Sequence, residues 1–187
     1  TQTLDVVRQH PEAFSVYALS AHRSIDLLIK QALEFNPAVV CIADETYYRP
    51  LCDALSDLPI RVLAGEKALA EMVTMPAIDV VVAAMVGYAG LRPTIEAIKA
   101  KKTIALANKE TLVVAGEIID RLAKRYKVDI LPVDSEHSAI SQSLVGEDMT
   151  SVEKLLLTAS GGPFRNFTLA QMQHVTASEA LRHPNWE

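Results

Sequence analysis

The chain has 187 residues, half of them apolar, so it can bury one sizeable core and is not intrinsically disordered. Its formal charge of −5, with no basic run longer than the lysine pair at 101 and 102, argues against a nucleic-acid partner or an anionic membrane surface. The two cysteines, Cys41 and Cys52, lack CxxC spacing, so we expect core thiols in a reducing compartment. The sequence contains no stretch as long as a membrane span and no signal-peptide pattern, and we therefore expect a cytoplasmic protein.

Short β-rich runs alternate with amphipathic segments along the chain. The runs lie at residues 14–19, 38–43, 60–63, 78–85, 102–107, 128–131 and 153–159. Helices are predicted between them, for example over 24–35 and 110–125, where apolar side chains recur with helical period. This alternation predicts an α/β fold with a Rossmann-like, doubly wound and mostly parallel sheet that is covered on both faces. The pattern becomes less regular after Ala159, which indicates a change of domain between about residues 130 and 160.

The first predicted element is a helix that ends at Pro11. In a doubly wound sheet the first helix follows a strand and a glycine-rich phosphate loop, so we expect the sequence to begin one strand late.

A cofactor-selecting position is then predicted at the end of the run 14–19. An acid there binds the ribose of NAD, whereas a base accepts the 2′-phosphate of NADP. His22, Arg23 and Ser24 occupy this position, and no acid precedes Asp26, which favours NADP. The alternative is an ordinary helix start with Ser24 as N-cap and Arg23 in solvent.

Two further strand ends carry candidate binding groups. Gly87 and Gly90 allow a tight turn after the run 78–85, where such sheets bind ligands, although a plain strand-to-helix turn is the favoured explanation. Asn108, Lys109 and Glu110 follow the run 102–107. Asn108 is suited to capping the next helix, but a lysine at a helix start opposes the helix dipole and favours an anionic partner.

The stretch "PVDSEHSA", residues 132–139, places two carboxylates on either side of a serine. If the backbone stays extended, Asp134 and Glu136 project to the same side and can bind one hard cation, with further oxygen ligands completing the shell of Mg²⁺ or Mn²⁺. The alternative is a helix start that is capped by Asp134 or Ser135 and has an acidic first turn. A zinc site is disfavoured because His137 lacks paired His or Cys ligands.

Two segments near the end of the sequence are weaker candidates. "TASGGPF", residues 158–164, can offer backbone N–H groups to a phosphate or form a simple tight turn. "RHPNWE", residues 182–187, contains His183 and Trp186 on either side of a proline.

Five motifs in this order, "TQTLDVV", "LANKE", "PVDSEHSAI", "LTASGGPF" and "HPNW", resemble the 1-deoxy-D-xylulose 5-phosphate reductoisomerase family along the whole chain. The resemblance implies NADPH- and metal-dependent conversion of that phosphorylated sugar to 2-C-methyl-D-erythritol 4-phosphate, for isoprenoid synthesis, by a cytoplasmic homodimer. It implies a cofactor domain over residues 1–131 and the start of an α+β catalytic domain over 132–187.

The resemblance also assigns roles to single residues. Asp134 and Glu136 are expected to bind Mg²⁺ or Mn²⁺ and Lys109 to act in catalysis. The expected NADPH-binding residues are His22, Arg23, Ser24, Asn108 and Glu110. The expected substrate-binding residues are Lys109, Ser135, Glu136, Ser160, His183 and Trp186.

The chain departs from the family pattern in three places. The family often has Gly-Lys-Asn where this chain has His22, Arg23 and Ser24. Arg23 keeps the positive charge of the lysine, whereas His22 and Ser24 replace the glycine and the asparagine. The glycine-rich loop and the segment carrying a third metal carboxylate are absent, and we expect the 187 residues alone to be inactive. The alternatives are a non-catalytic nucleotide-binding module and a different Rossmann dehydrogenase.

Overall fold

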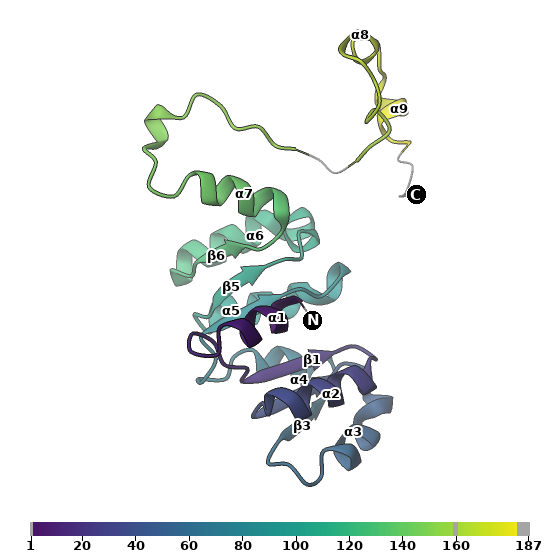
Figure 1. Cartoon of the computed structure of the whole chain (residues 1–187), viewed down its shortest axis with the longest axis vertical. Helices are drawn as coiled ribbons and strands as arrows, with labels where there is room; N and C mark the ends of the chain where they lie inside the picture. The colour runs from purple at the N-terminus through teal and green to yellow at the C-terminus, as the bar shows by residue number, and fades with distance from the viewer. Residues whose placement is uncertain (1, 159–160, 183–187) are drawn as a thin grey trace. The chain divides into compact units, whose positions relative to one another are not determined.

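The computed structural model describes residues 2–158 and 161–182 (Figure 1). The chain divides into two compact units, Thr1–Asp134 and Ser135–Glu187. Each unit is built from its own local elements.

The first unit alternates strands with helices, as its sequence pattern predicts. Its strands are β1 (Ala18–Ala21), β2 (Val39–Ile42), β3 (Arg61–Ala64), β4 (Val80–Ala83), β5 (Thr103–Leu106) and β6 (Ile130–Pro132). Its helices are α1 (Gln2–Gln9), α2 (Ile25–Phe35), α3 (Tyr48–Ala54), α4 (Glu66–Met72), α5 (Leu91–Lys99) and α6 (Glu110–Tyr126), with 3-10 turns η1 (Glu45–Tyr47) and η2 (Gly87–Gly90). Helix α6 is interrupted at Ala115, whose backbone is not helical.

The strands of the described residues form two parallel three-stranded sheets, in the orders β1-β2-β3 and β4-β5-β6. Ala21 pairs with Ile42 in the first sheet and Leu106 with Pro132 in the second, so neighbouring strands end side by side. All four residues of β2 are buried, as expected for a strand covered on both faces. The predicted α/β class with parallel sheets is confirmed.

Apolar helix stripes close the core on both sheets. Leu28 and Ala32 of α2 and Leu51 of α3 pack with Val40 and Ile42 of β2. A second cluster joins buried residues of α5, β5 and α6, namely Ala97, Ile98, Ile104 and Ile119. Each Leu or Ile that is fully buried contributes about 1.5–3 kcal/mol relative to an exposed one, so these clusters hold the strand ends in fixed positions.

Strand β4 has an open side. It pairs with β5, and no other strand of the described chain pairs with it. Val80 and Val82, on this four-residue apolar strand, keep 49% and 40% of their surface exposed.

The second unit contains α7 (Ser135–Ser143), η3 (Met149–Ser151), α8 (Leu169–Met172) and α9 (Ala177–Ala180). Capping boxes start the two short helices, at Thr168 with Gln171 and at Thr176 with Glu179. The strand predicted over 153–159 is wrong for its described part, because residues 153–158 form no strand and find no pairing edge within the described chain. Among residues 2–158 and 161–182, no helix has the length and apolar character needed to cross a bilayer.

Candidate functional site

The predicted binding residues of the first unit follow the carboxyl ends of its strands. Residues 22–24 follow β1, residues 108–110 follow β5, and Asp134 lies just beyond β6. Because neighbouring parallel strands end side by side, polar groups that follow them are brought together at one edge of each sheet. This is the edge where open α/β sheets bind ligands.

Arg23 forms an ion pair that the sequence did not predict. Its Nε lies 2.9 Å from Oδ2 of Asp44, which follows β2 just as Arg23 follows β1. The backbone N–H of Asp44 also donates to the carbonyl of His22, at 3.0 Å. His22 and Ser24 are exposed, and Ser24 stands at the N-cap position of α2 without a capping side-chain hydrogen bond. The signal for Asp44 was its position directly after the apolar run 38–43.

The Asp44 carboxylate is held in its charged form. The Thr46 hydroxyl donates to it at 2.7 Å and the Thr46 backbone N–H at 3.1 Å. These two hydrogen bonds, followed by the contact with Arg23, lower the pKa of Asp44. Arg23 uses Nε for this contact, and its side chain makes no other hydrogen bond within the described residues, so its terminal amino groups are available to an anion.

Asn108 is buried, and both the nitrogen and the oxygen of its side-chain amide form hydrogen bonds within the protein. Its Nδ2 group donates to the carbonyl of Met85 and, at 3.0 Å, to the carbonyl of Gly87. Its Oδ1 atom accepts from the backbone N–H of Thr111 at 3.3 Å, so it does satisfy a donor at the start of α6, as the capping hypothesis predicted. Both amide donors of Asn108 are therefore used within the protein.

Lys109 and Asp134 form the second charged contact at this edge. Lys109 Nζ lies 3.6 Å from Asp134 Oδ2, and the two side chains are 53% and 11% exposed. Lys109 precedes the first residue of α6, where the helix dipole disfavours a cation, and the carboxylate of Asp134 offsets this. The sequence predicted an anionic partner for Lys109, and the Asp134 carboxylate is one anionic group that lies beside it. Glu110 is exposed in the first turn of α6.

The extended backbone assumed for residues 134–136 is wrong, because α7 begins at Ser135 and places Glu136 in its first helical turn. An acidic residue at this position is favoured by the helix dipole. Ser135 is exposed and Glu136 is partly buried. The alternative of a helix start in this stretch is therefore the correct description of the backbone.

The metal-ligand hypothesis rests on carboxylates alone. Across the described residues, no group of three or more His, Cys, Asp or Glu side chains is arranged to hold a metal. Asp134 and Glu136 supply oxygen ligands of the kind that Mg²⁺ and Mn²⁺ prefer, so the donors fit in type while further ligands are needed. The predicted substrate-binding residues Ser160, His183 and Trp186 lie outside the described residues.

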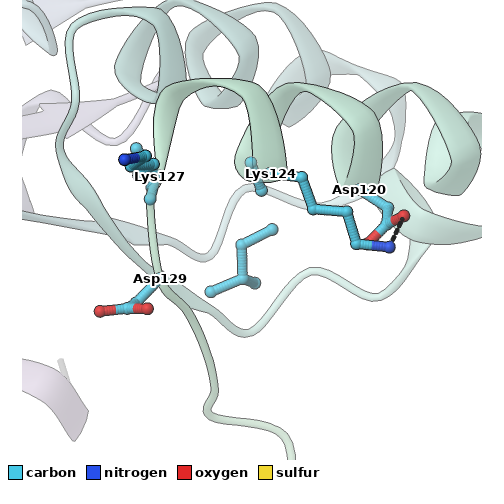
Figure 2. A pocket seen from close by; sticks show the side chains of 7 residues that line it. Asp120, Lys124, Lys127 and Asp129 are labelled. Atoms are coloured by element: carbon cyan, nitrogen blue, oxygen red, sulfur yellow. Dashed lines mark hydrogen bonds and ion pairs between the residues drawn. The ribbon is translucent and has the colours of Figure 1, made fainter.

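A pocket on the first unit lies away from these residues. Figure 2 shows it at the end of α6, where Lys124 contacts Asp120 at 2.7 Å and Lys127 and Asp129 lie near the start of β6. This is the amino end of β6, opposite to the carboxyl end that leads to Asp134. None of the predicted site residues lines this pocket.

Family profiles match both parts of the chain. The profile of 1-deoxy-D-xylulose 5-phosphate reductoisomerase matches residues 1–116, and the profile of the C-terminal domain of that enzyme matches residues 130–187. The reductoisomerase of Bacteroides fragilis is 59% identical over 187 residues, which cover 100% of this chain and 48% of that protein. The enzyme of Agathobacter rectalis is 55% identical over 186 residues, covering 100% of this chain and 49% of that protein. The chain thus spans about half the length of the curated relatives it matches.

Solved structures give the same match. The Zymomonas mobilis reductoisomerase in complex with NADPH aligns with a TM-score of 0.81 and 41% identity, covering 97% of this chain and 48% of that chain. A reductoisomerase in complex with NADPH, fosmidomycin and magnesium aligns with a TM-score of 0.79 and 40% identity, covering 99% and 48%. The chain belongs to the 1-deoxy-D-xylulose 5-phosphate reductoisomerase family.

Proposed function

We propose that the full-length protein converts 1-deoxy-D-xylulose 5-phosphate to 2-C-methyl-D-erythritol 4-phosphate, using NADPH and a divalent metal ion. The observation that carries this proposal is the alignment of the whole chain with reductoisomerases, at 59% identity to one of them. Solved relatives contain NADPH and magnesium, which supports the choice of cofactors.

The cofactor end of the proposed site is the carboxyl edge of the first sheet. Arg23 offers a guanidinium that Asp44 orients through Nε, and its terminal amino groups form the proposed contact with the 2′-phosphate of NADPH. His22 and Ser24, which are exposed beside Arg23, are proposed as further contacts for the adenosine end. NADPH supplies the hydride for the reductive step.

The reacting end of the proposed site follows β5 and β6. Asp134 and Glu136 would hold Mg²⁺ or Mn²⁺, which would supply Lewis-acid polarisation of the substrate's ketone and hydroxyl oxygens. Lys109 donates from Nζ to a substrate oxygen, and the nearby Asp134 carboxylate keeps this ammonium group at the amino end of α6. Asn108 and Glu110 are proposed to border the NADPH site, and Ser135 the substrate.

Ser160, His183 and Trp186 complete the proposed substrate-binding set. Residues 1–131 act as the cofactor domain in this proposal, and residues 132–187 begin the catalytic domain.

We also propose that the full-length protein is a cytoplasmic homodimer, for which light scattering should give twice the mass of one chain.

The test uses the full-length protein with Asp134→Asn and Glu136→Gln. Each amide keeps the shape of the side chain and removes the charge that a metal needs, so turnover should fall more than about a hundredfold, because even outer partners of metal ligands cost 10–100-fold. NADPH affinity, measured by fluorescence, should change little. Asp120→Asn is the matched control, because Asp120 is an exposed carboxylate paired with Lys124, and it should leave turnover unchanged.

Near-normal turnover of both variants at ordinary metal concentrations would refute metal binding by Asp134 and Glu136. Absence of turnover in the wild-type full-length protein, with NADPH, Mg²⁺ and substrate present, would refute the proposed function itself.

A further inference from the structure

We infer that Asp44 is a positioning residue that sets the preference for NADPH over NADH: its carboxylate holds the Arg23 guanidinium in an orientation that offers both terminal amino groups to a phosphate. The inference rests on the proposed function, in which Arg23 contacts the 2′-phosphate, and deepens it by naming the residue on which that contact depends. Asp44 itself follows β2, whereas Arg23 follows β1.

The backbone alone brings the two residues next to each other. Beyond the last strand pair, Ala21 with Ile42, the N–H of Ala43 donates to the Ala21 carbonyl at 2.9 Å and the N–H of Asp44 donates to the His22 carbonyl at 3.0 Å. The pairing of β1 with β2 therefore continues into the two loops that follow them. Because main-chain groups make these bonds, a substitution of the Asp44 side chain leaves the two loops in register.

The two carboxylate oxygens of Asp44 have different partners. Oδ1 accepts from the Thr46 backbone N–H at 3.1 Å and from the Thr46 hydroxyl at 2.7 Å, which caps η1. Oδ2 lies 2.9 Å from Arg23 Nε. Capping of a 3-10 turn needs one oxygen only, since Asp148 caps η3 with its Oδ1 atom, which accepts from the Thr150 backbone N–H at 2.9 Å. The capping role therefore leaves the contact with Arg23 unexplained.

The contact determines which donors of Arg23 face outward. A guanidinium carries one N–H at Nε and the others at its two terminal amino groups, and the edge formed by the terminal groups matches two oxygens of a phosphate. The Arg23 side chain is 69% exposed, whereas that of Asp44 is only 18% exposed. Without Asp44, this exposed arginine would sample several rotamers, and NADPH would have to immobilise it on binding.

The negative charge of Asp44 acts in the opposite direction. A carboxylate close to a phosphate repels it, so by charge alone the removal of this carboxylate would strengthen NADPH binding. Orientation and charge therefore predict opposite signs for Asp44→Asn. In that variant the two Thr46 donors retain the single amide oxygen, so the amide nitrogen faces Arg23 Nε, and two donors cannot bond to each other. The cap of η1 is kept, because asparagine is a good N-cap residue.

The experiment measures the dissociation constants of NADPH and NADH by fluorescence, in the full-length protein without substrate. Asp44→Asn should raise the constant for NADPH about three- to tenfold, which is the cost of immobilising one arginine side chain on binding, and should leave that for NADH unchanged. In an Arg23→Ala background the same substitution should not weaken NADPH binding further, because no guanidinium is left to orient. Asp148→Asn is the matched control, since it changes the same capping motif at η3 and should leave both constants unchanged.

Every other outcome overturns the inference. Unchanged or tighter NADPH binding in Asp44→Asn would mean that capping or charge is the whole role of Asp44. Equal weakening for NADPH and NADH, or the same weakening in Asp148→Asn, would indicate a general disturbance. Further weakening in the Arg23→Ala background would mean that Asp44 acts without Arg23. These results leave the proposed function in place, whereas failure of the wild-type protein to bind NADPH would refute the proposed function itself.

Discussion

Replacing Arg23 with alanine in the full-length protein should reduce the use of NADPH and leave the use of NADH almost unchanged. The Arg23 side chain is 69% exposed, so its pair with Asp44 adds little to stability and the variant should fold normally. Asp44 occupies Nε, which leaves the terminal amino groups for the 2′-phosphate. Losing one charge-assisted hydrogen bond to a phosphate costs about 1.5–3 kcal/mol, or about 10- to 150-fold in affinity.

The assay is a comparison of kcat/KM for NADPH and NADH in wild type, Arg23→Ala and Arg23→Lys. NADH lacks the phosphate, so its kcat/KM should stay within about twofold, whereas that for NADPH falls by the factor above. Arg23→Lys keeps the charge and loses the planar fork, and it should show an intermediate loss. Equal losses with both cofactors, or a wild-type protein that does not prefer NADPH, would refute this reasoning.

Two buried threonines and one buried thiol give further predictions. The Thr111 hydroxyl is buried without a hydrogen-bond partner in the described part of the chain, so Thr111→Val should raise the free energy of unfolding by about 0.5–1 kcal/mol. Thr94→Val removes the 2.7 Å hydrogen bond to the Gly90 carbonyl and should lower the free energy of unfolding by about 1–3 kcal/mol. Thermal or urea unfolding measures both, and destabilisation by both valines would show that Thr111 has a partner. Burial raises the pKa of Cys41 to about 11 from 9.0, so the folded state keeps its proton longer than the unfolded state. This thiol therefore leaves the free energy of unfolding unchanged below about pH 9 and should lower it by about 1 kcal/mol near pH 10. Cys41→Ala should abolish this loss, and the same pH dependence in that variant would contradict its assignment to Cys41.

The sequence predicted the strands of the first unit well and their limits less well. Continuous runs of β-branched residues report burial on both faces of a sheet, and each such run between residues 14 and 131 overlaps an observed strand. The first strand begins at Ala18 rather than at Phe14, because its extent depends on pairing with β2 and not on its own apolar content. The exposed leucines at 155–157 show the same limit, since an apolar run forms no strand without a neighbouring edge.

For the candidate site, the sequence predicted positions but not partners. Arg23 and Lys109 could be placed at strand ends because polar groups directly followed apolar runs. Their contacts with Asp44 and Asp134 depend on which strands are neighbours, and this is information that a single sequence does not contain. The two carbonyls held by Asn108 could not be foreseen either, since they depend on the local path of a turn.

The open side of β4 is a surface through which separate copies of this 187-residue polypeptide can associate. A strand of four small or branched apolar residues that pairs with a described strand on one side only is a template that an extended peptide can join, including β4 of another copy. Within this strand there is no lysine, proline or bulge, which are the features that natural sheets use to block such growth. We therefore expect the isolated polypeptide to aggregate more readily than a form in which another segment covers β4 with its exposed Val80 and Val82.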